Sequence, residues 1–490
     1  MGRLQLDLRV LTDDEAQSIH NAAVAVLGKT GVYIEHKRML DYLSALGATV
    51  DQNTVRFSEE LIERCLNAQV KKANDCENQI YADPWRLETF KIPCEEMGLN
   101  THIFCVNIMD RIDDQIRSAT LRDLEESVMV GNTLKLLHEM GPLVVPCDVP
   151  TNMNDAYMWH ALLKRSNKRV SGEIFNLHSI PYILEMCYLR TGGKKGFDKD
   201  PWVVYPCFYT GALKYSEEAL DIGFAAHDHG IPVRFGCTMG VAGMSSPITL
   251  AGALTSATAE GLAGIVMAEA VGGNSAGSLG SAISFHQGNG TALYQSPEKE
   301  LMTYAVRDMA RIYGFRDWRA FGGHSCSTDS CFPGLQAGAE KGFSALFAAM
   351  SGTISSHCGM LSPELACIPL MLADNEIIQM VNRMIQGIKV DEETIAEELI
   401  IDRGVAGNFL DINSEDAVEF SARHFRSENW IPRLFVRERP LRWSDIKTDL
   451  YQNAKNQVAK ILSEPQSPPL GEAETRELDR ILDKCKESCK

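Results

Sequence analysis

The chain has 490 residues, enough for one large domain with additions or for two domains. Its hydrophobic content of 45% and charged content of 23% are typical of globular proteins, and no apolar run approaches the roughly 20 residues of a membrane span. We therefore expect no membrane-spanning segment. The net charge of −17 disfavours nucleic acids and anionic membranes as partners, whereas a cationic ligand is compatible with it.

The cysteine pattern and the first residues point to the cytoplasm. Fourteen cysteines without close pairing are more typical of reduced thiols than of a disulfide framework. Charged residues interrupt each apolar pair of the N-terminal segment, so it lacks the apolar core of a secretory signal.

Residues 12–29 predict an amphipathic helix that Thr12 caps, with acidic residues in its first turn and Gly28 near its end. The rest of the chain to about residue 100 mixes short helices and strands. From about residue 118, β-rich runs alternate with helical segments, which indicates repeated βα units. Two helices are predicted to start at Ser246–Pro247 and Ser296–Pro297, where a serine cap precedes proline, and the second ends at Gly314.

Seven strands are predicted, and an eighth is expected near Ile103–Ile108. The seven are Val144–Val149, Lys168–Gly172, Trp202–Tyr209, Pro232–Cys237, Ser275–Phe285, Trp318–Gly323 and Thr353–Cys358. Such a series suits a closed barrel or an open doubly wound sheet, and the chain lacks the glycine fingerprint of a nucleotide-binding sheet. We predict an α/β fold, a (β/α)8 TIM-type barrel over residues 101–440, with an N-terminal α/β extension (1–100) and a C-terminal helical tail (441–490).

In such a barrel the catalytic residues follow the C-terminal ends of the strands. The stretch Phe321–Cys331 follows a predicted strand and is rich in glycine, and His357 ends the next strand. The alternatives are an ordinary turn that Asp329 caps and a histidine satisfied within the core. Five cysteines also fall near strand ends, but because no CxxC motif is present we expect no metal site. They are Cys207, Cys237, Cys326, Cys331 and Cys358.

A quaternary ammonium site would require aromatic faces and a carboxylate or two, because such a cation has no N–H to donate. The candidate carboxylates are Glu260, Glu298 and Asp329, although stabilisation of a helix dipole explains Glu298 more simply. The candidate aromatic residues near strand ends are Tyr205, Phe208, Tyr209, Phe285 and Phe332, and packing in the core is the alternative for each.

Several long stretches resemble the trimethylamine methyltransferase family, barrel enzymes that pass a methyl group from an amine to a corrinoid protein. They are SSPITLAGALTSATAEGLAGIVMAEAVGG, QSPEKELMTYAVRDMARIYGF, STDSCFPGLQAGAEKGFSALFAAMSGTISSHCGML, GVAGNFLD and ARHFRSENWIPRLF. The resemblance spans residues 12–450 and is densest from 236 to 436. Archaeal trimethylamine enzymes carry pyrrolysine near the loop containing TDS, whereas this chain has only the twenty standard residues. The resemblance therefore implies a quaternary amine substrate, such as glycine betaine, proline betaine, carnitine or butyrobetaine.

The resemblance also implies roles for individual residues. His357 would lie at the face toward the corrinoid, and Asp329 would contact the substrate or order its loop. Glu260 and Glu298 would be counter-charges, and the remaining pocket residues would be Tyr205, Phe208, Phe285, Phe332 and Cys331. The cobalamin would belong to a separate carrier protein, and we expect the chain to form homo-oligomers. Two alternatives are a zinc-dependent barrel methyltransferase with a thiol acceptor, using Cys326 and Cys331, and a non-catalytic binder of betaine-like solutes.

Overall fold

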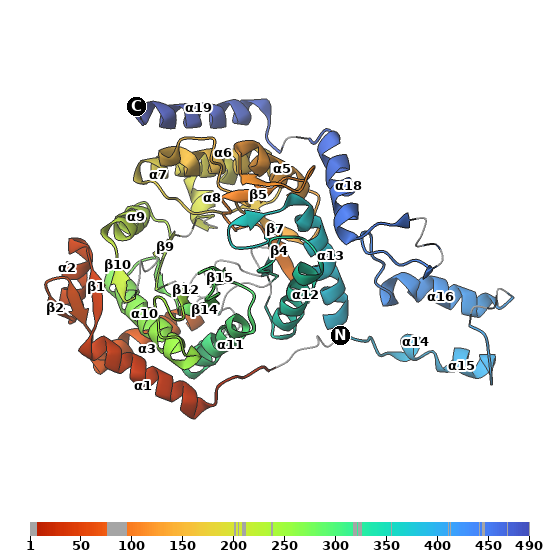
Figure 1. The fold of residues 1–490 in the computed structure, drawn as a ribbon, viewed down its shortest axis with the longest axis horizontal. Helices are drawn as coiled ribbons and strands as arrows, with labels where there is room; N and C mark the ends of the chain where they lie inside the picture. Colours follow the sequence, from red (N-terminus) through yellow and green to blue (C-terminus); the bar gives the residue numbers. More distant parts are fainter. Residues whose placement is uncertain are drawn as a thin grey trace.

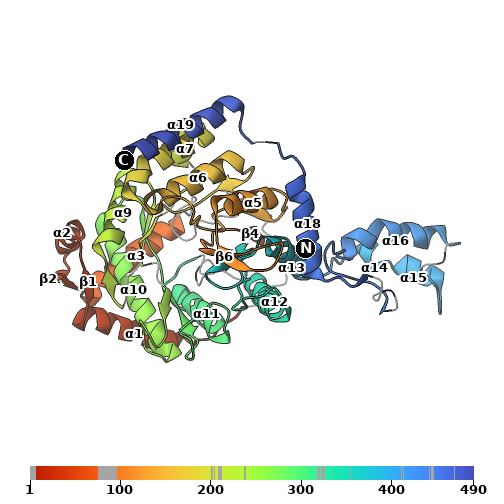
Figure 2. The same cartoon turned by 45° about the horizontal axis from the view of Figure 1, so that its top comes forward.

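Short parallel strands lie at the centre of the molecule, and helices surround them (Figures 1 and 2). The computed structural model describes residues 7–75, 96–199, 202–203, 205–207, 212–236, 239–316, 321, 326–353, 355–409, 411, 413–440, 442, 446–467 and 469–489. The predicted site residue Phe208 lies outside the described residues. Of the predicted strand Trp318–Gly323, only Phe321 is among the described residues, and residues 322–325 lie outside them.

The strands are short. Their bounds are β1 Val32–Ile34, β2 Thr49–Asp51, β3 Thr54–Arg56, β4 Gly98–Asn100, β5 Asn107–Met109, β6 Ile116–Ser118, β7 Leu137–Met140, β8 Arg169–Val170, β9 Tyr205–Cys207, β10 Lys214–Tyr215, β11 Val233–Phe235, β12 Met239–Val241, β13 Ser275–Gly277, β14 Ser281–Phe285, β15 Ala292–Leu293, β16 Ser355–His357 and β17 Leu365–Ala366.

The helices are longer and contain most of the buried apolar residues. Their bounds are α1 Asp13–Lys29, α2 Lys37–Leu46, α3 Glu59–Asp75, α5 Leu121–Gly131, α6 Asn154–Arg165, α7 Ile180–Thr191, α8 Lys194–Lys199, α9 Glu217–Asp228, α10 Leu250–Val271, α11 Pro297–Ile312, α12 Leu335–Met350, α13 Ile368–Ile385, α14 Glu392–Ile395, α15 Glu397–Arg403, α16 Glu415–Glu428, α18 Leu450–Ser463 and α19 Glu472–Ser488, with 3-10 turns η1 Thr151–Met153 and η2 Leu177–Ser179.

The central strands form two parallel sheets of mixed α/β character. One has the order β16-β4-β7-β8 and the other the order β13-β11-β9. A parallel bridge between Gly172 and Val203 connects β8 to β9 across the two sheets. The central strands β4, β7, β8, β9, β11 and β13 therefore lie side by side in chain order. Strand β16 pairs with β4 on its other side. The described residues contain no closed sheet, and most of the strand predicted at Trp318–Gly323 lies outside them.

Four predicted strands contain an observed one, and these four predictions are confirmed: Lys168–Gly172 contains β8, Trp202–Tyr209 contains β9, Pro232–Cys237 contains β11, and Thr353–Cys358 contains β16. The strand predicted at Val144–Val149 is wrong, because β7 lies earlier and Val144 forms only an isolated bridge with Cys105. Pro146 interrupts that apolar run and has no amide hydrogen to donate to a ladder.

Two further strand predictions need correction. The central strand expected near Ile103–Ile108 is β4, which ends at Asn100, whereas β5 pairs with β6 in an antiparallel hairpin and with β17. The segment Ser275–Phe285 contains two strands rather than one. Of these, β13 belongs to the central parallel series, and β14 pairs with β12 and β15 in a separate sheet.

The local helix signals are mostly confirmed. Thr12 caps α1 in a reciprocal capping box with Glu15, and Ser296 caps α11 by accepting the Lys299 amide. The start predicted at Ser246–Pro247 is wrong, because Thr249 caps α10 instead. The carbonyl of Ser246 accepts the Gly243 amide in a tight turn, so the backbone of Ser246 is already engaged.

Helix α10 is long and apolar enough to cross a membrane by length and composition, yet 72% of its apolar window is buried. It packs against α1, α2, α3, α11 and β13, so it has the surroundings of a core helix.

The N-terminal and C-terminal segments both pack on the central body. The N-terminal strand β1 pairs in parallel with β10, while α18 packs on α13 and α5, and α19 lies along α6 and α7 (Figure 1). By contrast, α14, α15 and α16 project from the body as an arm in both views.

Candidate functional site

Polar residues in register cross four neighbouring parallel strands, and in β16, β4 and β7 they lie at or next to the C-terminal end of the strand. His357 of β16 pairs in register with Asn100 of β4, Asn100 with Glu139 of β7, and Glu139 with Arg169 of β8. We call this row, together with His102 and Glu173 in the loops that follow β4 and β8, the polar edge. The C-terminal edge of a parallel sheet in an α/β protein is where ligands and catalytic groups gather.

An ion pair and an amide bridge hold the polar edge together. Arg169 Nη1 lies 2.7 Å from Glu139 Oε2, and Glu139 is only 1% exposed. Burial raises the pKa of Glu139, and the positive charge of Arg169 opposes this rise. The Asn100 amide donates from Nδ2 to Ser355 Oγ at 2.9 Å and accepts the His102 backbone amide at 3.2 Å. The two strands β16 and β4 are thus joined by side chains as well as by their ladder.

A carboxylate and an aromatic ring contact His102, and a second aromatic ring packs on the first. His102 Nε2 lies 3.7 Å from Glu173 Oε1, and the His102 ring meets the Phe104 ring at 4.7 Å between centroids. The Phe104 ring in turn meets Phe175 edge to face at 5.5 Å. Phe175 remains 36% exposed. We call His102, Phe104, Glu173 and Phe175 the aromatic cluster. It combines the aromatic faces and the carboxylate that a quaternary ammonium ion requires.

Helix α6 fixes the loop that carries Glu173 and Phe175. Trp159 donates from its indole nitrogen to the Glu173 carbonyl at 3.0 Å. The carboxylate of Asp155, which is fully buried, accepts the amides of Phe175 and Asn176, each at 2.9 Å. Because charge-assisted bonds of this kind are strong, the loop has a defined position at the polar edge.

The predicted catalytic residues lie in two different settings. The register places His357 on the polar edge. Both carboxylate oxygens of Asp329 accept backbone amides, from Tyr294 at 2.7 Å and from Gln295 at 3.0 Å. Burial raises the pKa of Asp329, and these two amides oppose the rise. These contacts tie Asp329 to residues 294–295, whereas the roles predicted for Asp329 were contact with the substrate or the ordering of its own loop.

The two predicted counter-charges, Glu260 and Glu298, lie in settings that the fold itself explains. Glu260 is 4% exposed and accepts the Leu213 amide at 3.1 Å. Glu298 is exposed in the first turn of α11, where the helix dipole stabilises it. Its neighbour Glu300 is the buried acid of this turn, in contact with Lys299 at 3.2 Å.

The predicted pocket residues are dispersed over several elements. Tyr205 is buried within β9, and Phe285, at the end of β14, lies close to Gly243. Phe332 is 54% exposed, and its ring meets that of Tyr451 in α18 at 6.2 Å. Cys331 is exposed.

A buried ion pair lies under the loop that contains Cys326. Lys341 and Asp374 are both fully buried, with Nζ to Oδ2 at 3.0 Å. Lys341 also donates to the Cys326 carbonyl at 2.7 Å, and Asp374 accepts the Gly359 amide at 2.8 Å. Burial raises the pKa of the Cys326 and Cys358 thiols, so both are protonated at neutral pH. These contacts fasten the loop to α12 and α13.

Sequence reasoning missed Asn100, His102, Glu139, Arg169 and Glu173. A usable signal was present in β7, where His138 and Glu139 interrupt an otherwise apolar strand. Polar side chains inside a buried strand need partners, and such partners gather at functional sites.

A mixed α/β body whose parallel strands carry a row of polar side chains, of which Asn100 and Glu139 are buried, has the architecture of an enzyme. The sequence matches the model of the family described as "Trimethylamine methyltransferase (MTTB)" over residues 3–490. The chain therefore belongs to the trimethylamine methyltransferase family and is a methyltransferase. This confirms the family resemblance.

Relatives in the family carry two kinds of name. The chain is 26% identical to a trimethylamine methyltransferase MttB of Desulfitobacterium hafniense, over 96% of this chain and 93% of that protein. It is 25% identical to a glycine betaine methyltransferase of the same species, over 96% and 95%. It is 35% identical to a trimethylamine methyltransferase MttB of Methanosarcina thermophila, over 83% and 84%. Among solved structures, the monomethylamine methyltransferase of Methanosarcina barkeri aligns over 92% of both chains with 9% identity and a TM-score of 0.40.

Proposed function

We propose that the chain demethylates a betaine-like quaternary amine and passes the methyl group to Co(I) of a separate corrinoid protein. The aromatic cluster of His102, Phe104, Glu173 and Phe175 carries this proposal, because it offers ring faces and a carboxylate to a cation without N–H groups. The absence of pyrrolysine from the sequence supports a substrate other than trimethylamine. A relative named glycine betaine methyltransferase adds to this support.

The chemistry places few demands on the protein. Co(I) supplies an electron pair to the N-methyl carbon, the C–N bond breaks, and its electrons remain on nitrogen. The products are methyl-Co(III) and a neutral tertiary amine, so the leaving group needs no proton. The chain has to hold the cation, orient one methyl group toward the acceptor and exclude water. Glu173 would balance the positive charge of the substrate, and the rings of Phe104 and Phe175 would pack on its methyl groups.

The remaining residues complete the proposed site. His357, at the end of the polar edge, would face the corrinoid protein, and Asp329 would keep residues 294–295 in place. We now assign the role of counter-charge to Glu173 rather than to Glu260 or Glu298, because Glu260 accepts a backbone amide and Glu298 is exposed.

The proposed architecture is a closed barrel. The parallel strands from β4 to β13 follow chain order and β16 pairs with β4, which supports the eight-stranded barrel predicted from the sequence. The predicted extension (1–100) contains β4, which is a strand of this series, and the predicted barrel (101–440) contains the projecting helices α14 to α16. We therefore propose a barrel that begins at β4 and is followed by that arm and by the tail (441–490), and we propose a cytoplasmic homo-oligomer.

The test is an absorbance assay with Co(I) cobalamin and purified protein. The amines are glycine betaine, proline betaine, carnitine, butyrobetaine and trimethylamine, and the signal is methyl-Co(III). We expect methyl transfer from a quaternary amine and none from trimethylamine. Glu173→Gln should lower kcat/KM at least about tenfold, since one lost charge contact in a desolvated site is worth about 1.4 kcal/mol or more. Glu217→Gln, an exposed residue in the first turn of α9, is the matched control.

Three outcomes would overturn the proposal. Turnover of trimethylamine alone would contradict the substrate class. Zinc-dependent methyl transfer to a thiol, lost in Cys326→Ser or Cys331→Ser, would support the alternative chemistry. Calorimetric binding of a betaine without methyl transfer would identify a solute-binding protein.

A further inference from the structure

We propose that His178, Cys485 and Cys489 form a zinc site that fastens the C-terminal helix to the loop of residues 173–178. One ligand atom from each of the three side chains lies within 4.8 Å of the other two. The site is separate from the polar edge, and it does not depend on the function proposed above.

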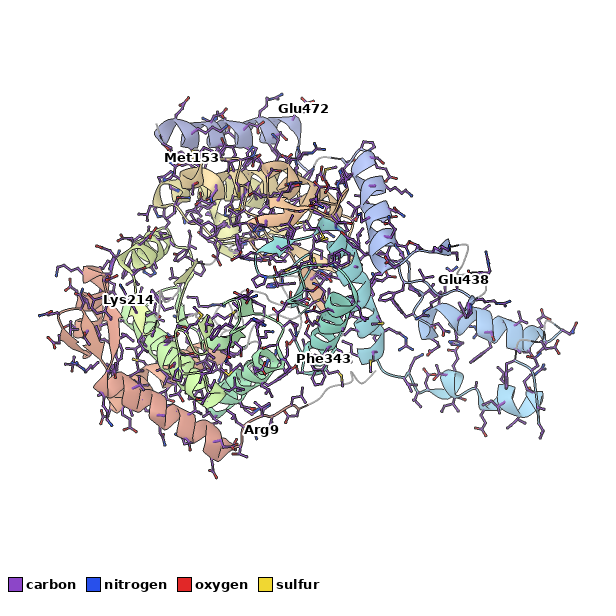
Figure 3. The ribbon with its side chains drawn as sticks, viewed as in Figure 1. Arg9, Met153, Lys214, Phe343, Glu438 and Glu472 are labelled. Atoms are coloured by element: carbon purple, nitrogen blue, oxygen red, sulfur yellow. The ribbon has the colours of Figure 1, made fainter. Side chains whose placement is uncertain are left out.

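The three residues come from two elements that pack together. Cys485 and Cys489 are four residues apart on α19 and its C-terminal cap, so they share one face of the helix, as the two histidines of a helical HExxH zinc motif do. His178 belongs to η2, directly before α7, and α19 packs on both α7 and α6. Cys485 is buried with Met153, which Figure 3 labels near α19, and with Leu482. Apolar packing therefore holds the ligands near one another before a metal binds.

The His178 ring has a nitrogen that is buried. Its Nε2 is shielded from solvent and has no hydrogen-bond partner among the described residues. A buried polar atom without a partner is costly, and a metal ion would satisfy this nitrogen. The Nε2 atom is also one of the two ring nitrogens through which histidine binds zinc.

The donor set suits zinc. Thiolate sulfur and imidazole nitrogen are preferred ligands of a tetrahedral zinc ion, and with three protein ligands the fourth position would be open to water. Tetrahedral ligands at the usual Zn–S and Zn–N distances lie about 3.5 Å apart, so movements of roughly 1 Å would close the site.

Burial, together with the nearby Cys489 and Asp155, raises the pKa of the Cys485 thiol to about 12. Zinc binds the thiolate and so must displace a proton. Its affinity is therefore expected to rise with pH.

The metal would control the position of a functional segment. The loop of residues 173–178 begins with Glu173 and Phe175 of the aromatic cluster and ends at His178. Asp155 holds its middle through the amides of Phe175 and Asn176. Zinc at His178 would hold its end and join it to α19.

Metal analysis and cobalt titration of the reduced, full-length protein test the proposal. We expect about one zinc per chain after purification, and a sulfur-to-cobalt charge-transfer band when Co²⁺ is added to chelator-treated protein. Cys489→Ser and His178→Gln should each lower the Co²⁺ affinity at least about tenfold. Cys147→Ser, which removes an exposed cysteine on another part of the chain, is the matched control and should leave the affinity unchanged.

Two results would overturn the inference. The first is a reduced protein that neither retains zinc nor develops the charge-transfer band. The second is Co²⁺ binding of equal strength in Cys489→Ser and in the control, which would place the metal elsewhere. Cys489 is only partly buried, and far-ultraviolet circular dichroism identifies any variant that fails to fold. His178→Gln then supplies an independent measurement on a different element.

Discussion

Replacement of Lys341 by methionine should destabilise the protein strongly. The variant Lys341→Met leaves Asp374 as a fully buried carboxylate without its cation and leaves the Cys326 carbonyl without its donor. Breaking a buried pair from one side costs about 3–5 kcal/mol, because the remaining charge is uncompensated. The surface pair of Lys37 with Asp41 is the control, since its side chains are 88% and 62% exposed. Lys37→Met should cost at most about 0.5 kcal/mol.

Urea unfolding followed by circular dichroism measures both variants, and a double variant tests the cause. Lys341→Met with Asp374→Leu removes both charges and should recover part of the loss. The Gly359 amide would still lack its acceptor, which leaves a cost of about 1–3 kcal/mol. A loss below about 1 kcal/mol in Lys341→Met would refute the reasoning. So would a double variant that is less stable than the single one.

Three further changes test local features of the fold. In Gly141→Ala the new Cβ would lie 2.7 Å from the His102 Cα atom, so we expect a loss of about 1–3 kcal/mol and weaker betaine binding; an unchanged melting temperature would contradict this. Thr12→Ala should cost about 1 kcal/mol in urea unfolding by removing the α1 cap, whereas Thr12→Ser should retain most of it. Burial alone would raise the pKa of Asp123, but hydrogen bonds led by that from Arg117 hold it below its ordinary value. This pair therefore stabilises the fold above about pH 4, and the contribution disappears as the pH falls through the lower folded-state pKa. Asp123→Asn should flatten the dependence of the unfolding midpoint on pH in that acidic window, and an unchanged slope would exclude this account.

Local signals were predictable where a single short-range contact decides the structure. The caps at Thr12 and Ser296 depend on residues three positions away, and both were found from the sequence. Ser246–Pro247 carries the same signal as Ser296–Pro297, yet a bond from Gly243 to the Ser246 carbonyl competes with the helix start. The residue types at these positions do not reveal that competing hydrogen bond.

The candidate site was less predictable because it depends on register between distant strands. His357 was singled out from the sequence, but its partner Asn100 was not, since the strand predicted there began after Asn100. Glu139 was missed with β7, whose two polar residues weakened the strand pattern. The polar residues that a site requires interrupt the apolar pattern by which a buried strand is predicted from the sequence.

The pairing of β16 with β4 has a consequence for how the chain is made. Asn100 and its hydrogen-bond partner Ser355 are 255 residues apart, so a ribosome adding about 5–20 residues per second needs roughly 13–50 seconds to supply that partner. During this interval one side of β4 is an open strand edge on a nascent chain, and such edges recruit other strands. Fast translation and chaperones that cover this edge should therefore raise the yield of native enzyme, whereas a pause between residues 100 and 355 should favour aggregation.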